Sequence, residues 1–429
     1  MSTGQFPLPT GQFPVPEYAP PSGEGTADPG AVGFVLRLGK ALHQNGYPAH
    51  QLEQALALVA RRLGLTAQFF STPTSIFAGF GTPDRQQTTM TRVEPGDVNL
   101  ARLSRLDQVM RDVLDGRATA LQGSARVEHL QVAPGPYPRA LTVAAFGLAS
   151  GAVAVLLGGG WREILTAALL GVVTGLLDAV VAPFRRARTI FEPTAAFAVA
   201  LLAALAGVWL GGYGQGIATL AGLIVLLPGL MLTTAMTELA TQHLASGTAR
   251  LSGALITFLS IAFGVALASK VAPLLMTIPA TAAASPLPSW TTYPAIVVAA
   301  LSFTVLLRAE PADAGWIVLA GALSYLSARA GRERLGPELG AFIGALVIGV
   351  ASDVFARVFR RPSAITQVPG VLIIVPGSVG YRGLMSLLND QVVVGIETAF
   401  QMALIGVSIV AGLLMSNVLV PGESFGRER

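Results

Sequence analysis

Two stretches of this 429-residue chain carry the same pattern: LAGLIVLLPGLMLTTAMTEL at residues 220–239 and VPGVLIIVPGSVGYRGLMSL at residues 368–387. An offset of 148 residues aligns them without gaps, which places Gly222 on Gly370 and the pair Pro228–Gly229 on Pro376–Gly377. The same register continues through Gly247 and Gly395, Gly264 and Gly412, and Pro273 and Pro421. Gly and Pro are unfavourable inside helices, so their recurrence in register indicates an internal repeat rather than generic apolar similarity.

The repeats lie in a series of apolar segments, each near the roughly 20 residues that cross a bilayer. The sequence predicts ten such spans, at about 140–157, 163–182, 193–211, 216–237, 250–271, 292–308, 313–330, 338–358, 366–388 and 393–420. The sixth and seventh are marginal in length, which leaves nine or eleven spans as alternatives. Five spans in each unit is an odd number, so the second unit would enter the membrane from the opposite side. The expected fold class is therefore a mainly α membrane protein with two related five-helix inverted repeats, at 139–275 and 290–421, as in many secondary transporters.

The composition agrees with a membrane protein. Hydrophobic residues make up 52% of the chain and charged residues only 12%, about half the share typical of soluble domains. The absence of Cys excludes disulfides and thiolate metal sites, and the four His are too scattered to suggest a metal site, so neither a metal nor a cofactor is expected. Basic residues form no run interleaved with aromatic residues, so a nucleic acid is not an expected partner.

Charge is denser at the start of the chain. Residues 1–139 carry 12 Lys or Arg and 11 Asp or Glu, whereas residues 140–429 carry 16 and 13 over twice the length. Within the first part, the Pro-rich residues 1–30 predict a disordered tail. Residues 31–134 predict a small α+β domain with helices at 31–44, 48–63 and 97–114, the last capped by Asp97, and strands within 65–80 and 86–93.

Orientation is predicted from the loops. No secretory signal precedes the α+β domain, which is therefore expected in the cytosol. With the N-terminus inside, the inner loops and tail hold ten Arg and the outer loops five Lys or Arg, which favours two cytoplasmic termini. The cluster Arg329, Arg332 and Arg334 fits this arrangement badly, because it falls in an outer loop.

Pro228, Gly229, Pro376 and Gly377 are the first candidate substrate-binding residues. They fall near the centres of the fourth and ninth spans, where Pro removes a backbone donor and an opened backbone needs a protein partner or a polar cavity. Two discontinuous helices gripping a polar substrate are one interpretation. Two plain kinks in packed helices are the other.

Ionisable residues inside the spans are the second signal, because each is costly in hydrocarbon. Asp178, Asp353 and Glu238 are the candidate proton-coupling residues, although each Asp could instead pair with Arg near the membrane surface. Arg382 is the candidate for a substrate carboxylate, since its planar guanidinium suits that group. The alternative, which we favour from sequence, is a salt bridge in each helical hairpin, Arg382 with Glu397 and Glu238 with Arg250.

Enzyme signatures are missing from the sequence, which has no GxxxxGK[ST] loop, G-x-S-x-G elbow or HExxH motif. His43 and His50 with Ser71, Thr72, Thr74 and Ser75 could assemble a hydrolytic site, but a core or surface role suits them better. The chain is therefore not expected to be an enzyme.

The residues carry a family resemblance. LRLGKALHQNGYPAHQLE at residues 36–53, ARRLG at 60–64, TPTSIF at 72–77, and TRVE at 91–94 with VNL at 98–100 look like the N-terminal module of the threonine/serine exporter family. Leu227-Pro-Gly229, Glu238-Leu239, Gly247, Arg250-Leu251 and Gly264 are similar to its first membrane half, and Val375-Pro-Gly377, Tyr381-Arg-Gly-Leu384 and Gly395 to its second. The resemblance covers about residues 31–420.

The resemblance implies a cytosolic N-terminal module, ten spans and export of small hydroxylated amino acids driven by the proton-motive force. The leading hypothesis is thus a threonine or serine exporter, an antiporter in a bacterial inner membrane, whose partners are the amino acid, protons and the bilayer. A dicarboxylate exporter for a solute such as succinate, which should need more than one cationic group, stays an alternative. So does a membrane receptor or regulator whose N-terminal domain signals. The sequence leaves a homo-oligomer open.

Overall fold

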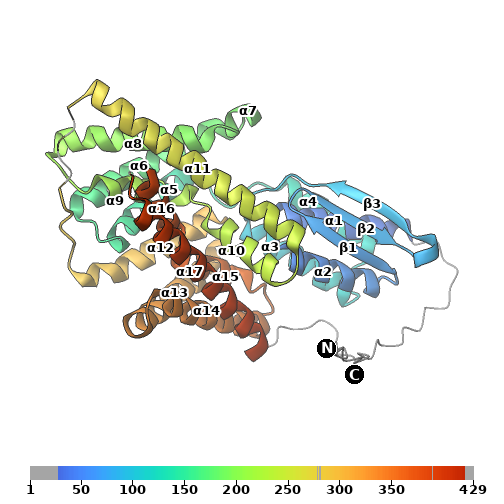
Figure 1. Cartoon of the computed structure of the whole chain (residues 1–429). Coiled ribbons are helices and arrows are strands. Elements are labelled where there is room, and N and C mark those ends of the chain that lie inside the picture. Colours follow the sequence, from blue (N-terminus) through green and yellow to red (C-terminus); the bar gives the residue numbers. More distant parts are fainter. Residues whose placement is uncertain (1–27, 278, 280–281, 389, 421–429) are drawn as a thin grey trace, which may run out of the picture.

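The computed structural model describes residues 28–277, 279, 282–388 and 390–420, so the Pro-rich segment 1–27 and Pro421 lie outside the described residues. Four helices and a sheet near the N-terminus gather at one end of a larger helical bundle (Figure 1). We call residues 28–132 the N-terminal domain and residues 139–420 the helical bundle.

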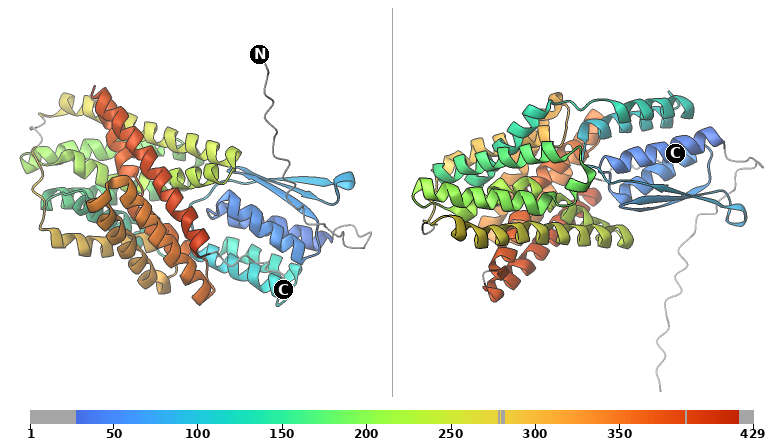
Figure 2. Two further views of the ribbon diagram at one scale, coloured as in Figure 1. Left: turned by 60° about the horizontal axis from the view of Figure 1, so that its bottom comes forward. Right: turned by 90° about the horizontal axis from the view of Figure 1, so that it is seen from above.

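The N-terminal domain is a three-stranded antiparallel sheet beside a helical layer (Figure 2). Its helices are α1 (Pro29–Gln44), α2 (Ala49–Arg62), α3 (Leu100–Leu114) and α4 (Ala120–Val132). Its strands are β1 (Ala67–Thr72), β2 (Ser75–Phe80) and β3 (Gln87–Arg92), with a short 3₁₀ turn, η1 (Pro83–Arg85), between the last two. Apolar residues at helical spacing, such as Phe34, Leu38, Leu52 and Leu56, are fully buried and form its core.

Three details of the N-terminal domain differ from the expectation. The stretch 65–80 holds two strands, because Pro73 and Thr74 make a tight turn that pairs Thr72 with Ser75. Asp97 does not cap α3; that cap is Asn99, whose side chain accepts from the Arg102 amide at 3.0 Å. The helix α4 was not anticipated, although Thr119 and Gln122 form a capping box at its start.

The helical bundle follows the expected apolar segments closely. Its first half comprises α5 (Arg139–Leu156), α6 (Trp161–Val181), α7 (Arg185–Arg188), α8 (Phe191–Leu210), α9 (Gln215–Gly222), η2 (Ile224–Leu226), α10 (Gly229–Ala240) and α11 (Leu244–Leu275). Its second half comprises η3 (Ser289–Thr291), α12 (Thr292–Leu306), η4 (Pro311–Asp313), α13 (Ala314–Leu335), α14 (Pro337–Phe359), α15 (Ala364–Ile374), α16 (Gly377–Leu388) and α17 (Val392–Leu419).

Among the described residues, eight helical segments are long and apolar enough to cross a membrane, or nine when the bent pair 215–222 and 224–240 counts as one span. The expected span at 313–330 is present as the helix α13, but α13 is not among them. Its last turns carry Arg329, Arg332 and Arg334, the residues that already fitted the expected topology badly. A count of ten spans stays a prediction.

The two halves of the bundle pack in matching ways. A Cβ added to Gly264 in α11 would lie 2.9 Å from Ala196 Cβ in α8, and one on Gly412 in α17 would lie 2.9 Å from Ala345 Cβ in α14. Thr174 in α6 donates to the Gly222 carbonyl at 3.1 Å, and Ser324 in α13 donates to the Gly370 carbonyl at 2.8 Å. Corresponding residues of these contacts in the two halves are 148–150 positions apart in the sequence. The sequence register therefore corresponds to similar contacts in space.

The N-terminal domain is joined to the helical bundle by a shared core and by backbone hydrogen bonds. Ala300, Leu307, Ala309 and Ile317 belong to the same buried cluster as the core of the N-terminal domain. The amides of Leu100 and Ala101 at the start of α3 donate to the carbonyls of Leu307 and Arg308 at 3.0 and 3.1 Å. The N-terminal domain is therefore packed on the bundle rather than tethered to it.

Candidate functional site

Each Pro–Gly pair interrupts a helix. Leu227 and Val375, the residues before the two Pro, have nearly the same extended backbone, with φ −65° and ψ 129° for Leu227 and φ −62° and ψ 136° for Val375. A separate bend of 48° lies just before the first break, between residues 215–222 and 224–240. Since Pro lacks an amide and clashes with the preceding turn, both helices restart one residue after it.

The two breaks contact each other. A Cβ on Gly377 would lie 3.8 Å from Gly229 Cα, and one on Gly229 would overlap the side chain of Val375. Pro228, Gly229, Pro376 and Gly377 are thus brought together, as a site shared by two halves requires. None of the four lines the cavity described next.

A cavity of about 660 Å³ lies between α16 and helices of the first half, within the roughly 300–1,000 Å³ common for small-molecule sites. Its lining includes Leu157 at the end of α5 and Gln215 at the start of α9. Its polar lining residues come from α9, α11 and α16: Gln215, Thr219, Ser269, Tyr381, Arg382 and Ser386. The remaining lining is apolar or glycine, which suits a ligand with a few polar groups.

Arg382 is the one charged residue in the described lining of this cavity. Its Nε reaches the Ser378 carbonyl only at 3.5 Å, the limit of a hydrogen bond. No ion pair of Arg382, with Glu397 or any other carboxylate, is found in the part of the chain that the structure describes. Its guanidinium therefore remains available to a carboxylate ligand.

The neutral lining residues Gln215, Thr219, Ser269 and Ser386 were not anticipated from the sequence. Hydroxyl and amide side chains are common in membrane helices, where they bond neighbouring backbone. These residues can be identified as a possible site only because three helices bring them together around Arg382. The sequence of any one helix does not show that they are close in space.

Glu238 lies in a different place from Arg382. It is fully buried at the end of α10 and forms the expected salt bridge with Arg250, at 3.0 Å. It also accepts from Ser246 Oγ at 2.8 Å and from the Ala49 amide of α2 at 3.0 Å. Glu238 is thus saturated with donors at the junction with the N-terminal domain.

Asp353 is buried in α14, where Ser416 of α17 donates to Oδ2 at a long 3.5 Å. Asp178 is half-buried near the end of α6, close to the charges of Arg188 and Arg308. Of the two buried candidates, Asp353 and Glu238, Asp353 therefore has the weaker hydrogen-bond partners. Asp178 lies near the surface that the N-terminal domain covers.

Three of the four His also gather beside Glu238. The rings of His50 and His243 lie 6.0 Å apart, and His243 Nε2 is 3.5 Å from Glu53 Oε2. Burial, and then the charge of His243, lower the pKa of His50 to about 4. Among the described residues no group of three or more His, Asp or Glu is placed to hold a metal. The contacts of His243 with His50 and Glu53 join the bundle to the N-terminal domain.

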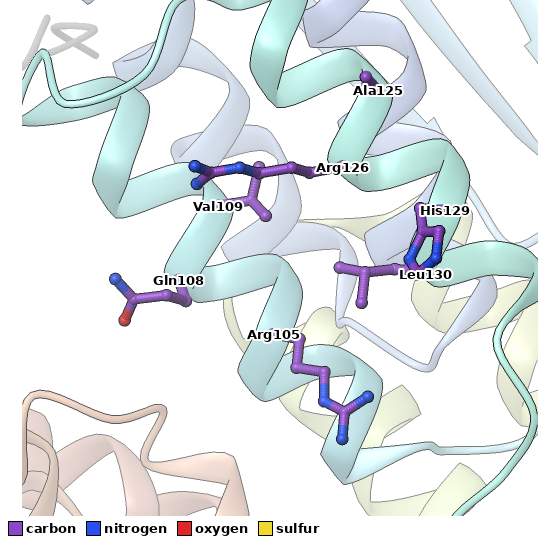
Figure 3. Close-up of a pocket in the computed structure, with 7 residues that line it drawn as sticks. All are labelled: Arg105, Gln108, Val109, Ala125, Arg126, His129 and Leu130. Carbon is purple, nitrogen blue, oxygen red and sulfur yellow. The ribbon is translucent and has the colours of Figure 1, made fainter.

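A second hollow, of about 440 Å³, lies between α3 and α4 on the N-terminal domain (Figure 3). Arg105, Arg126 and His129 border it, and all three are exposed. Arg105 is paired with Glu310 at 3.1 Å and Arg126 with Asp112 at 2.8 Å. Since both guanidiniums are already paired with carboxylates, this hollow is a weaker candidate than the Arg382 cavity.

Comparison with known proteins is consistent with this geometry. Residues 33–272 match the family described as "Putative threonine/serine exporter", and residues 293–419 match "Threonine/Serine exporter, ThrE". No solved structure matches the chain at a significant level.

Relatives occur in bacteria and fungi. The chain is 26% identical to a threonine/serine exporter of Corynebacterium glutamicum, over 90% of this chain and 81% of that protein. It is 25% identical to a probable threonine/serine exporter of Mycobacterium tuberculosis, over 92% and 77%. It is 24% identical to the pheromone-regulated membrane protein 10 of Eremothecium gossypii, over 92% of this chain but only 55% of that protein. The chain thus spans about half the length of this fungal relative. By its match to the family over both parts, the chain belongs to the threonine/serine exporter family.

Proposed function

We propose that this protein is a secondary transporter that exports small hydroxylated amino acids, of which threonine and serine are the leading candidates. The observation that carries the proposal is the Arg382 cavity, where one available guanidinium lies among hydroxyl and amide groups. A guanidinium binds a carboxylate through two parallel hydrogen bonds. The surrounding Thr219, Ser269 and Ser386 can bond a substrate hydroxyl or ammonium group.

The number of cationic groups separates the proposed substrate from a dicarboxylate. A dicarboxylate such as succinate calls for two cationic partners, and the described lining contains Arg382 alone. This favours a substrate with a single carboxylate.

We further propose that the two halves form an inverted repeat and that transport proceeds by alternating access around the crossing of the breaks. The like contacts at Gly264 and Gly412, and at Thr174 and Ser324, support this arrangement. In the proposed orientation the N-terminal domain and both termini face the cytoplasm of a cell, in the plasma membrane of a bacterium. The Arg382 cavity then opens to the outside.

Coupling to an inward proton gradient is assigned to Asp353. Strong donors favour the charged form of a carboxylate. A carboxylate that must take up and release a proton should therefore have few of them. Asp353 has one long contact from Ser416, whereas Glu238 has Arg250, Ser246 and the Ala49 amide. Antiport of amino acid against protons through Asp353 is the resulting mechanism.

The test is counterflow and gradient-driven flux of labelled threonine, serine and succinate in proteoliposomes. Gradient-stimulated threonine or serine flux is expected, saturable and dependent on Arg382. Flux of succinate alone would replace the substrate, and flux of none of the three would favour the regulator hypothesis.

A further inference from the structure

If the two halves form the proposed inverted repeat, the residues that correspond to the Arg382 cavity should lie toward the opposite face of the bundle. With the offset of 148 residues, the cavity residues Tyr381 and Ser386 of α16 correspond to Thr233 and Glu238 of α10. The contacts of Gly264 with Ala196 and of Gly412 with Ala345 set the register of α8 on α14, which makes Asp353 the counterpart of Ala204. The counterpart region therefore contains Thr233, Glu238 and Asp353.

All three residues of this counterpart region are buried, and the N-terminal domain contacts Glu238 through α2. Thr233 is 4% exposed and Glu238 is fully buried. The first turn of α2 is directed at Glu238, so that the Ala49 amide donates to Glu238 Oε1 at 3.0 Å. A carboxylate is favoured at a helix N-terminus both by the free amides and by the helix dipole. The turn between α10 and α11 reaches the N-terminal domain in Figure 1.

A second set of contacts reinforces this junction. Glu53 in α2 accepts from the Ser71 amide at 2.7 Å and lies 3.5 Å from His243 Nε2. His50 in α2 packs its ring against that of His243. The junction thus joins α2 to the α10–α11 hairpin through two carboxylates, Glu238 and Glu53. Each of them contacts both the N-terminal domain and the hairpin.

We propose that the N-terminal domain is a gate on its own face of the bundle. Docking of α2 on Glu238 holds the counterpart region closed, and separation of α2 from Glu238 opens it while the Arg382 cavity closes. The inference rests on the proposed alternating-access function and adds its regulation. It assigns Glu238 to gating, with Asp353 left to coupling.

The experiment uses the absence of Cys in the full chain. Thr233→Cys reports on the counterpart region and Ser386→Cys on the Arg382 cavity, each by its rate of labelling with a small polar thiol reagent in detergent. Ala49→Pro removes the amide that donates to Glu238. It should leave α2 intact, because Pro is well tolerated at the first position of a helix and Pro48 already has an extended backbone (ψ 149°). Ala49→Gly is the matched control that keeps the amide.

Loss of one hydrogen bond to a charged group shifts an equilibrium by roughly 10- to 100-fold. We expect Ala49→Pro to raise the labelling rate of Thr233→Cys at least tenfold over Ala49→Gly, and to slow labelling of Ser386→Cys. Unchanged labelling of Thr233→Cys would overturn the gate. Faster labelling at both positions would overturn it as well, because it would indicate general loosening.

Glu238→Gln is a second, independent variant that weakens the same contact and should change the two labelling rates in the same directions if Ala49→Pro does not fold. Labelling needs no substrate, so its outcome is separate from that of the flux assay. The expected labelling without threonine or serine flux would keep the gate and reject the substrate, whereas flux with unchanged labelling would keep the substrate and reject the gate.

Discussion

Gly229 and Gly377 face each other where the two broken helices meet, close enough that a Cβ on Gly377 would lie 3.8 Å from Gly229 Cα. The contact is not symmetric. A Cβ on Gly229 overlaps the Val375 side chain, whereas the nearest atom to a Cβ on Gly377 is Leu227 Cβ at 3.5 Å, an ordinary contact.

Gly229→Ala should therefore be harmful and Gly377→Ala tolerated. Overpacking costs about 1–3 kcal/mol, so Gly229→Ala should lower the thermal unfolding temperature and the transport rate, while Gly377→Ala changes both little. Val375→Ala should restore much of the loss in the double variant, because it removes the overlapping methyl groups. Equal effects of the two Ala substitutions would contradict the observed packing of the breaks.

Arg382→Gln should reduce threonine or serine flux about 10- to 100-fold, since it removes charge-assisted hydrogen bonds to the substrate carboxylate. Arg382→Lys should recover only part of the flux, because an ammonium group lacks the planar pair of donors. Flux against substrate concentration in proteoliposomes measures both. Arg334→Gln, at the exposed end of α13, is the control; a similar loss there would indicate a general effect of surface charge.

Asp353→Asn should abolish stimulation of flux by a proton gradient and leave counterflow exchange largely intact, because the amide fits the site but carries no titratable proton. Ser416→Ala, which removes the hydroxyl 3.5 Å from Oδ2, should retain coupling and shift its dependence on pH. Flux at several pH values with and without the gradient separates the two. Asp353→Asn with normal gradient stimulation would remove this residue from the coupling mechanism.

Docking of the N-terminal domain should weaken in acid because of His50. The titratable groups that act on it are His243, whose ring lies 6.0 Å away, and Glu238. Its pKa is lowered to about 4 when docked, against 6.5 for the free group, so the undocked form binds more protons between these values. Docking is thus strongest above about pH 6.5 and weakens as the pH falls toward 4, by at most roughly 3 kcal/mol.

The labelling rate of Thr233→Cys, corrected for the reagent's own pH dependence, measures this effect. It should rise between pH 7 and pH 5, and His50→Gln should flatten the rise. His129→Gln, in the exposed end of α4, should leave the rise unchanged. If the labelling rate still rises in His50→Gln, a group other than His50 causes the pH dependence.

The apolar spans could be predicted because their length and composition are fixed by the bilayer. The helices α5, α8 and α14 begin and end within two residues of the expected bounds. The span at α13 was less certain for a physical reason, since its Arg residues lower its hydropathy. Arg382 was a candidate for a substrate carboxylate, and that role stays a prediction, while its expected salt bridge with Glu397 is not found among the described residues.

The junction with the N-terminal domain could not be predicted in the same way. Ala49 and Glu238 are 189 residues apart. The donor is a backbone amide, which nearly every residue type has, so the sequence does not single it out. The neutral residues around Arg382 are hidden for a related reason, because Thr219 and Ser269 look like ordinary helix-packing residues until the helices are assembled. Long-range convergence, rather than local pattern, defines both sites.

The core that the N-terminal domain shares with Leu307, Ala309 and Ile317 has a consequence for the order of assembly. The ribosome completes the N-terminal domain first, yet the apolar partners of that domain emerge more than 170 residues later, after the whole first half of the bundle has been inserted. Domains generally fold as units during synthesis, from the N-terminus onward, and this one presents an unfinished face until α12 and α13 arrive. The apolar part of the junction therefore forms only once α12 and α13 have been made, whereas the polar contacts of α2 with the α10–α11 hairpin can form earlier.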